Sequence, residues 1–387
     1  MSNILTLNAG SATIKFSVYH AGTSPVLRLS GHVDALGSDD ATLTVGHGES
    51  RHFRHLGPID HAAGIRAILE EVASEHIVAV GHRIVHGGTE HDAPALLDEA
   101  VLSDLEQLSA FAPLHQPHNL AGVRAAMAAF PQAVQIGCFD TAFHRGHPWV
   151  NDAFALPREY YAKGIRRYGF HGLSYRYIAE ELARIDPDGH ERCVVAHLGN
   201  GASLCALRDG HSVSSTMGFS ALDGLPMGTR CGQLDPGVVL YLFQQEGMSA
   251  EQISDLLYLE SGLKGLSGLS NDMRVLQDSG TKESQQAIDY FAFRIRREIG
   301  AMAAVLGGLD CLVFTGGIGE NSAALRAKVC ADLGWLGIAL QDEANSRNDP
   351  VISDGKVVVR VVPTNEELVI ARSVFNLLDR QGSPETP

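Results

Sequence analysis

The stretch MSNILTLNAGSATIKFS, residues 1–17, predicts a β-hairpin. Its apolar run Ile4–Leu7 is typical of a buried strand, and alternation of apolar and polar residues resumes from Ile14. Between the two runs lies the turn Asn8-Ala9-Gly10-Ser11, whose glycine allows the chain to reverse. The chain therefore opens with a strand, a tight turn and a second strand.

The tip of this hairpin has the groups that a phosphate chain needs. Asn8, Ser11 and Thr13 lie at or next to the turn, and Lys15 follows directly behind. Backbone N–H groups beside a glycine, two hydroxyls and an ammonium together favour a phosphate ligand. An ordinary polar hairpin tip is the alternative for this segment taken alone.

A second copy of the pattern lies about half a chain later, in RCVVAHLGNGASLCAL, residues 192–207. Cys193–Ala196 is again a buried strand, His197–Gly201 is a glycine-rich turn, and an apolar strand follows Ala202 and Ser203. The repeat predicts a duplicated domain in which each half offers one phosphate-facing hairpin to a shared cleft. The similarity is short, so chance agreement stays open. The P-loop pattern G-x-x-x-x-G-K-[ST] does not occur, and any nucleotide is held in another way.

Size and composition indicate a two-domain soluble enzyme. The chain has 387 residues, which is too long for one simple core. Its content of 45% hydrophobic and 19% charged residues is typical of a soluble globular enzyme. A net charge of −15 argues against nucleic acid or an anionic membrane as partner. An anionic ligand must then be held by a few placed cations. No apolar run is long enough to span a bilayer. Because the N-terminus has no basic region and enters a strand directly, we expect no signal peptide.

The cysteines point to a reducing, cytoplasmic location. They are scattered, without a C-x-x-C pair, and most lie inside apolar runs, which is neither a disulfide framework nor a zinc site. The six positions are Cys138, Cys193, Cys205, Cys231, Cys311 and Cys330.

Strand patterns alternate with helical patterns along the chain, which predicts an α/β protein. Short antiparallel strands are expected over 19–58, and the buried strand that ends at Asp140 is expected to lead out of the first domain. Helices are expected over 61–76, 96–111, 119–130 (capped by Asn119), 281–306 and after Asn365, and buried strands begin near residues 76, 133, 311 and 357.

Four cations fall at the ends of strong elements or in loops, where sites are usually built: Arg83, His115, His171 and Arg230. For each one, a surface charge or a satisfied loop histidine is the alternative. Arg230 stands out because Gly228 and Gly232 flank it closely. Such a backbone presents one guanidinium, which suits an arginine that meets charge on a transferring phosphoryl group.

Acidic and glycine-rich segments complete the candidate site. Asp140 ends a buried strand and needs a partner, either an arginine or a metal reached through water, or it caps the next turn. Asp272 and Arg274, with the GG-x-G run 316–319, suit a ribose and a flat base. Glu366 and Glu367 start the last helix, and one of the two carboxylates, next to Asn8, could hold Mg²⁺ on the phosphates. The alternative for Glu366 is a first-turn acid that complements the helix dipole.

Taken together, the chain resembles the acetate kinase family, within the acetate and sugar kinase, heat-shock chaperone and actin superfamily. The resemblance covers essentially the whole length. It rests on ordered motifs: LNAGSATIKF, GHRIVHGG, APLHQPHNL, FDTAFH, RRYGFHG, AHLGNGAS, MGTRCGQLDPG, SGLSNDMR, GGIGEN and PTNEELVIAR.

The resemblance implies two ribonuclease-H-like, actin-like ATPase domains with a central interdomain cleft. Residues 1–142, completed by the helix 366–387, would form the first domain, and 143–365 the nucleotide-binding and dimerisation domain. It also implies a homodimer, ATP and ADP as co-substrates, and Mg²⁺ with Mn²⁺ as a substitute.

The resemblance further implies a role for each candidate residue. Asp140, His171, Arg230 and His115 would be catalytic, and Asn8 and Glu366 would serve the metal. Arg83 would bind the carboxylate, in a pocket with Val85, Leu114, Phe170 and Ala221. The ATP side would take Ser11, Thr13, Lys15, His197, Leu198, Gly199, Asn200, Gly201, Asp272, Met273, Arg274, Gly317, Ile318, Gly319, Glu320 and Asn321.

Several positions depart from the usual family pattern without removing a catalytic residue. Gln116 replaces an asparagine, Leu173 and Tyr175 replace threonine and histidine, and Cys231 and Gln233 replace serine and aspartate. Ala12 replaces a hydroxyl residue, and Ala221 stands where proline is usual. These changes bear on rate and acid specificity.

The implied reaction is ATP plus acetate giving ADP and acetyl phosphate. A carboxylate is already nucleophilic at neutral pH, so catalysis consists of positioning and charge stabilisation. A propionate or other short-chain carboxylate kinase is the alternative within the family. A nucleotide-dependent clamp is the alternative from another class, but the chain lacks long insertions for a peptide or polymer.

Overall fold

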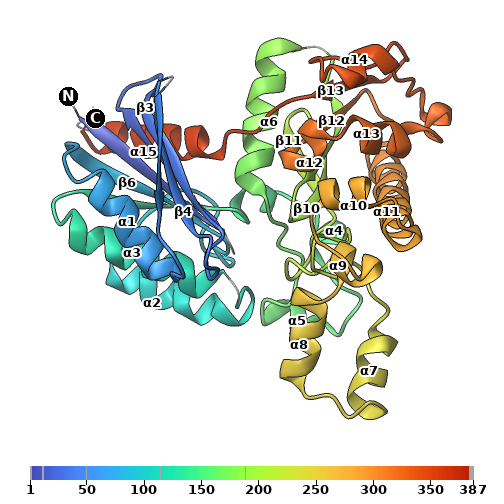
Figure 1. Cartoon of the computed structure of the whole chain (residues 1–387), viewed down its shortest axis with the longest axis horizontal. Helices are drawn as coiled ribbons and strands as arrows, with labels where there is room; N and C mark the ends of the chain where they lie inside the picture. The colour runs from blue at the N-terminus through green and yellow to red at the C-terminus, as the bar shows by residue number, and fades with distance from the viewer. Residues whose placement is uncertain (1, 11–12, 49, 114, 188, 383–387) are drawn as a thin grey trace. The chain divides into compact units, whose positions relative to one another are not determined.

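The computed structural model describes residues 2–10, 13–48, 50–113, 115–187 and 189–382. The chain divides into two compact units (Figure 1). The N-terminal unit comprises Met1–Ala142 and Asn365–Pro387, and the C-terminal unit comprises Phe143–Thr364. In the part of the chain described, no helix is both long and apolar enough to cross a membrane.

The N-terminal unit is built on one sheet of eight strands in the order β5-β4-β3-β2-β1-β6-β8-β7. Its strands are β1 (Asn3–Ala9), β2 (Ile14–His20), β3 (Val26–Asp34), β4 (Thr42–His47), β5 (Ser50–His55), β6 (Ile77–Ile84), β7 (Ala95–Leu96) and β8 (Val134–Phe139). Its helices are α1 (His61–Glu71), α2 (Glu99–Gln107), α3 (Gln116–Ala129) and α15 (Glu366–Gly382), with a 3-10 turn η1 (Leu108–Ala110).

Helices cover both faces of this sheet, so β1 is buried along its whole length. Leu5 and Leu7 of β1 pack in the core cluster with α1, through residues such as Ile65 and Ile68. The opposite face carries α15, which contacts β1 and β6 (Figure 1). Gly81 of β6 permits this approach, because a Cβ there would lie 2.4 Å from Cγ2 of Ile370.

The C-terminal unit contains a five-stranded sheet in the order β11-β10-β9-β12-β13. Its strands are β9 (Arg192–Leu198), β10 (Ala202–Arg208), β11 (His211–Ser215), β12 (Cys311–Thr315) and β13 (Val358–Val361). Its helices are α4 (Trp149–Asp152), α5 (Arg158–Ala162), α6 (Gly172–Ile185), α7 (Pro236–Gln244), α8 (Ala250–Leu259), α9 (Gly262–Ser267), α10 (Met273–Ser279), α11 (Lys282–Leu306), α12 (Gly316–Asn321), α13 (Ala323–Cys330) and α14 (Asp342–Ser346). The 3-10 turns are η2 (Ala142–His144), at the boundary between the units, and η3 (Gly334–Leu336).

The two sheets repeat one pattern of strand order and direction. In the N-terminal unit β1 pairs antiparallel with β2 and β2 with β3, while β1, β6 and β8 are parallel. In the C-terminal unit β9 pairs antiparallel with β10 and β10 with β11, while β9, β12 and β13 are parallel. The predicted α/β class and the two strand–turn–strand hairpins are confirmed.

Three helix predictions need correction. The helix expected over 61–76 is α1, which ends at Glu71. The helix expected over 96–111 is α2 followed by the 3-10 turn η1, and it begins at Glu99 after the cap Asp98. The helix expected to be capped by Asn119 begins at Gln116 with His115 in the cap position. Asn119 lies inside α3 because its side chain serves a tertiary contact, described below. The cap by Asn365 is confirmed, since its Oδ1 accepts from the N–H of Leu368.

Candidate active site

Three polar side chains of the N-terminal unit meet at one edge of its sheet. β1, β6 and β8 are parallel neighbours, so their carboxyl ends lie together. Asn8 lies near the end of β1, Arg83 near the end of β6, and Asp140 directly after β8. Their neighbours Leu7 and Ile84 belong to core clusters on the opposite face. Since side chains alternate along a strand, Asn8 and Arg83 point to the face that carries α15.

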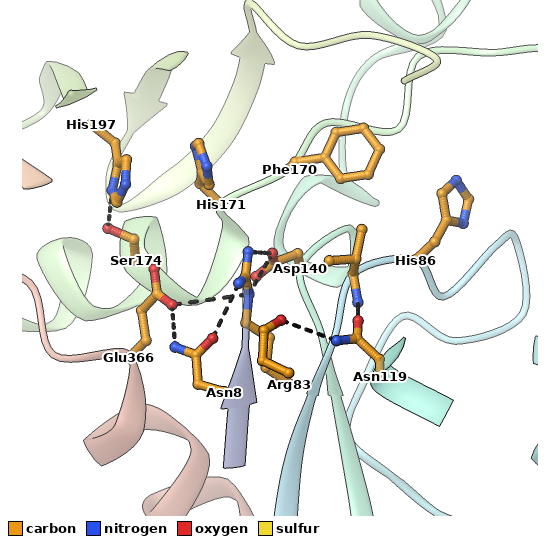
Figure 2. Close-up of polar contacts among 12 residues, drawn as sticks. Asn8, Arg83, His86, Asn119, Asp140, Phe170, His171, Ser174, His197 and Glu366 are labelled. Atoms are coloured by element: carbon orange, nitrogen blue, oxygen red, sulfur yellow. Dashed lines mark hydrogen bonds and ion pairs between the residues drawn. The ribbon is translucent and has the colours of Figure 1, made fainter. Parts of the chain in front are cut away.

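Arg83 links this group together (Figure 2). Its Nε and Nη2 both donate to Oδ2 of Asp140, at 2.8 and 2.6 Å, and its Nη1 donates to Oδ1 of Asn8 at 3.1 Å. Asp140 is almost fully buried and the Arg83 side chain is 14% exposed. Burial opposes the charged guanidinium, but Asp140 and Glu366 outweigh it and raise the pKa of Arg83. This arginine is therefore a fixed cation.

The N-terminus of α15 brings two carboxylates to the same place. The amide of Asn8 donates to Oε2 of Glu366 at 2.9 Å and to Oε1 of Glu367 at 3.0 Å. Glu366 also lies 4.0 Å from Nε of Arg83. Segments more than 350 residues apart thus form one polar cluster at the sheet edge, with net negative charge.

A metal would be held here by oxygen atoms. Within the described residues, no group of three or more His, Cys, Asp or Glu side chains gathers to hold a metal unaided. The donors present are the partly buried carboxylate of Glu366 and the amide oxygen Oδ1 of Asn8, which also accepts from Arg83, and oxygen atoms are hard ligands. Mg²⁺ takes one or two carboxylates and keeps waters or phosphate oxygens as its other ligands. The donor set therefore fits Mg²⁺.

Two buried amides hold the loop that follows Arg83, and the sequence reading missed both functions. Asn119 accepts from the N–H of Val85 at 3.0 Å and donates to the carbonyl of Ala9 at 3.1 Å, which ties the end of β6 to the end of β1 (Figure 2). Gln116 accepts from the N–H of His86 and donates to its carbonyl. Gln116, which replaces an asparagine of the family pattern, thus holds the backbone of His86 through two buried hydrogen bonds. For Asn119 the local sequence was ambiguous, because an asparagine before a helical run is also a common helix cap.

The first hairpin presents its polar residues at two places. The carbonyl of Gly10 contacts Nε2 of His61 at 2.9 Å, and Thr13 donates to Asp34. Lys15 lines a small cavity of 220 Å³ with residues that include Glu367. Ser11, predicted to contact phosphate, and Ala12 lie outside the described residues.

In the C-terminal unit, His171 occupies a strained position just before α6. Its φ of +58° is left-handed, which is uncommon for a residue with a side chain. Its Nδ1 lies 2.8 Å from Oγ of Ser203, and its ring stacks on that of His197 with centroids 4.3 Å apart (Figure 2). Nδ1 of His197 in turn contacts Oγ of Ser174 at 2.8 Å. Both imidazoles are therefore oriented by hydroxyls.

Arg230 is presented by a loop whose backbone is tightly packed. Gly232 has φ +71°, and a Cβ there would lie 2.5 Å from the backbone of Leu225. Nη1 of Arg230 donates to the carbonyl of Ala221 at 3.4 Å. The amide oxygen of Gln233 accepts from Arg294 at 3.0 Å and from Arg297. The departure at Gln233 thus anchors the loop to α11 through a neutral oxygen.

A cavity of 520 Å³ in the C-terminal unit joins the second hairpin to α10 and α12. Its lining contains eight of the residues predicted for the nucleotide: Gly199, Asn200, Asp272, Met273, Arg274, Gly317, Ile318 and Asn321. It also contains three that the sequence reading did not name: Asn271, Gln277 and Ser322. The residues come from three separate segments of the sequence, 199–200, 271–277 and 317–322, so the cavity is a product of the fold.

Other residues predicted for the nucleotide do not line this cavity. Glu320 accepts from the N–H groups of Gly316 and Thr364, so its carboxylate stabilises the turn after β12. Within the lining itself, Asp272 caps α10 and pairs with Arg274 at 2.6 Å, and the hydrogen bond from Arg274 lowers the pKa of Asp272. His197, Leu198, Gly201 and Gly319 are also outside the lining.

The side chains predicted for the acid pocket differ in burial. Val85, in the loop after β6, and Phe170, before His171, are both buried. Ala221 is half-buried in the loop that carries Arg230. His115, predicted to be catalytic, is half-buried at the start of α3. Leu114 lies outside the described residues.

Comparison with known proteins identifies the family. A model described as the acetokinase family matches residues 3–372. A relative named acetate kinase, from Methylocella silvestris, is 51% identical over 399 residues, which cover 98% of this chain and 99% of the relative. The structure of a propionate kinase from Francisella tularensis has a TM-score of 0.90 at 34% identity, covering 96% of this chain and 99% of that one.

A second solved structure agrees. Acetate kinase from Porphyromonas gingivalis has a TM-score of 0.85 at 36% identity, covering 98% of this chain and 100% of that one. The neighbours share the actin-like ATPase fold, as the resemblance implied. Since the family model spans nearly the whole sequence and the relatives align over almost their full lengths, this chain belongs to the acetokinase family.

Proposed function

We propose that this protein is an acetate kinase, which transfers the γ-phosphoryl group of ATP to acetate and gives ADP and acetyl phosphate in a reversible reaction. Family membership across residues 3–372 carries the proposal. The two sets of polar side chains supply what the reaction needs: a fixed cation for a carboxylate in one unit, and a nucleotide-sized cavity in the other.

Arg83 is the proposed anchor for acetate. A guanidinium has five N–H groups, and the contacts to Asp140 and Asn8 use three of them. One N–H remains on each terminal nitrogen, which is enough for a two-point contact with a substrate carboxylate. Asp140 then acts by fixing the arginine, because its buried charge already faces that guanidinium.

Arg230, His171 and His115 are the proposed partners of the phosphoryl group in transfer. An arginine on a rigid loop and an oriented imidazole stabilise charge that develops on the equatorial oxygens.

The nucleotide is proposed to occupy the 520 Å³ cavity. Gly317 and Ile318 expose backbone to a flat base, and Asn321 and Asp272 offer polar groups to the nucleoside. Lys15, Ser11 and Thr13 are proposed on the phosphate side. Glu366 and Asn8 would hold Mg²⁺, with Mn²⁺ as a substitute, and the bound ion neutralises phosphate charge.

We also propose a cytoplasmic homodimer formed through the C-terminal unit. Helix α7 has no buried residue in the single chain, yet it carries Leu240, Tyr241 and Phe243, each more than half exposed. Exposed apolar residues gathered on one helix are typical of a surface that pairs with another chain. Buried free cysteines suit a reducing compartment.

Propionate is the competing substrate, and one residue favours its acceptance. Ala221 stands where the family usually has proline, and the propionate kinase of Francisella tularensis is a close structural neighbour. The alternative function is therefore a propionate kinase that uses the same residues.

One assay tests the proposal. The purified protein is incubated with ATP, Mg²⁺ and acids of two to four carbons, and hydroxylamine traps any acyl phosphate as a hydroxamate. We expect product with acetate, and its loss on chelation of the metal. Release of ADP without any hydroxamate would instead indicate a nucleotide-dependent clamp, or ATP hydrolysis without phosphoryl transfer to the acid.

A further inference from the structure

Tyr175 places a phenol hydroxyl inside the C-terminal unit, where water does not reach it. Tyr175 lies in the second turn of α6, and its side chain and that of Ser203 on β10 are fully buried. Its Oη lies 2.5 Å from Oγ of Ser203, and Oγ of Ser203 lies 2.8 Å from Nδ1 of His171. The three groups form a chain that ends on the imidazole proposed to meet the phosphoryl group.

The direction of this chain follows from its buried end. Among the described residues, Ser203 is the one hydrogen-bond partner of the Tyr175 hydroxyl. The phenol proton has no other acceptor, and a buried donor left without an acceptor costs about 1–3 kcal/mol. Burial also raises the pKa of Tyr175 well above its usual value, so the phenol keeps its proton. Tyr175 therefore donates to Ser203.

The proton on Ser203 is then directed to His171. A serine hydroxyl has a single proton, and its oxygen already accepts from Tyr175, so that proton points to Nδ1 of His171. Nδ1 accepts, and in a neutral imidazole the other nitrogen, Nε2, carries the proton. The buried tyrosine thus selects one of two tautomers.

The backbone holds the imidazole in a single orientation. His171 has a left-handed φ, a conformation that persists only where the surroundings determine it. Stacking on His197 fixes the plane of the ring, and Nδ1 of His197 is held independently by Ser174. The ring is thus oriented by contacts that do not involve substrate.

We propose that Tyr175 and Ser203 are positioning residues, which keep neutral His171 with its proton on Nε2 so that this nitrogen donates a hydrogen bond to the phosphoryl group in transfer. The proposal rests on the proposed function for its catalytic meaning. The tautomer itself is a property of the protein without substrate.

The first test is ¹⁵N spectroscopy of the full-length protein labelled at histidine, at a pH where imidazoles are neutral. His171→Gln identifies the signals of His171, and His197 serves as internal reference. We expect an unprotonated Nδ1 in the wild type and mixed tautomers in Tyr175→Phe. Ser203→Ala, which removes a smaller group, is the second variant should Tyr175→Phe fail to fold. A protonated Nδ1 in the wild type, or an unchanged spectrum in the folded variant, overturns the proposal.

The second test is kinetic. Tyr175→Phe should lower kcat about tenfold, the effect of losing an outer partner that orients a functional imidazole, with KM for ATP and acetate little changed. Tyr177→Phe, the same change on the same helix, is the matched control and should keep kcat. Mixed tautomers with an unchanged kcat would remove the catalytic role. A wild type that forms no acyl phosphate would overturn the proposed function instead, and the spectra would still decide the tautomer.

Discussion

Arg83 donates two hydrogen bonds, from Nε and Nη2, to one oxygen of Asp140, and a third, from Nη1, to Asn8. The pair joins the carboxyl ends of β6 and β8. It converts a flexible side chain into a cation whose two remaining N–H groups have a set direction. A carboxylate substrate, which we propose to bind at Arg83, would therefore meet an arginine that has already lost most of its conformational freedom.

Asp140→Asn tests this relationship. The amide keeps the size of the side chain but removes the charge, and a charged hydrogen bond contributes about 1.5–3 kcal/mol. We expect kcat/KM for acetate to fall about 10- to 100-fold, with KM for ATP little changed. Asp152→Asn is the matched control, because Asp152 is also buried and paired, with Arg166 at 3.0 Å. It should lower thermal stability and leave the acetate KM as it was.

Arg230→Ala should act on the chemical step. Arginines that stabilise phosphoryl transfer contribute about 10³-fold or more to kcat. We expect a loss of that order with ADP binding nearly unchanged in a calorimetric titration. Arg274→Ala, in the lining of the 520 Å³ cavity, provides the contrast and should weaken nucleotide binding more than it lowers kcat. A defect of Arg230→Ala confined to KM for ATP would mean that its role is misassigned.

Stability should decline below pH 6.5 because of buried neutral histidines. Burial lowers the pKa of His82 to about 4 despite its hydrogen bond to Gln135, and the pKa of His144 is also lowered to about 4 by burial. Between pH 6.5 and 4 the unfolded chain binds protons that the folded chain does not, so the free energy of unfolding falls as pH falls. Each histidine contributes up to about 3 kcal/mol over that window.

The measurement is denaturant unfolding at pH 7.5, 6 and 5. His82→Gln keeps a donor for Gln135 and should flatten the pH dependence relative to the wild type. His52→Gln is the control, because His52 is exposed and pairs with Glu71 at the surface. Equal slopes for His82→Gln and wild type would show that the buried imidazole is not the source.

Asn119→Ala should damage both stability and the acid site. It removes the partners of the Val85 N–H and the Ala9 carbonyl, and each buried group left unpaired costs about 1–3 kcal/mol. We expect a lower free energy of unfolding together with a raised acetate KM. Asn151→Ala, which removes one bond to the Val213 carbonyl, should affect stability alone. A normal acetate KM in Asn119→Ala would separate this clamp from substrate binding.

Much of the fold could be predicted because it depends on local patterns. The buried strands and glycine turns at residues 3–20 and 192–208 are present in the sequence, and each forms the predicted antiparallel pair. Alternation along a strand also places Asn8 and Arg83 on one face once β1 and β6 are neighbours. The neighbour order itself is a tertiary property, so the sequence indicated the residues without their contacts.

The positioning residues could not be predicted, for a physical reason. The local sequence suits Asn119 as a helix cap. In the fold its side chain instead bonds two buried backbone groups, the N–H of Val85 and the carbonyl of Ala9. Tyr175 and Ser203 are 28 residues apart, and although Tyr175 departs from the family pattern, nothing in the local sequence indicates its contact with Ser203. The left-handed backbone of His171 carries no sequence signature of its own, since glycine rather than histidine marks such positions.

The proposed acid pocket gives the last prediction, because the resemblance implies a proline where this chain has Ala221. Alanine lacks two ring carbons of proline, so the pocket is wider at this position and the local φ angle is free to vary. One added methylene buried there contributes roughly 0.8 kcal/mol, about a fourfold effect, and discrimination by one methylene rarely exceeds about 10- to 200-fold. We therefore expect propionate to have a kcat/KM within about tenfold of acetate.

Ala221→Pro should move that ratio back toward acetate, measured as hydroxamate formed from each acid at matched enzyme concentration. The carbonyl of Ala221 accepts from Arg230 at 3.4 Å, so the variant must also be checked for an unchanged kcat with acetate, which separates pocket size from a displaced arginine. Pro226, buried in the same loop, offers a second wall that could shift to fill the space. Rejection of propionate by more than about a hundredfold in the wild type would mean that position 221 does not bound the pocket.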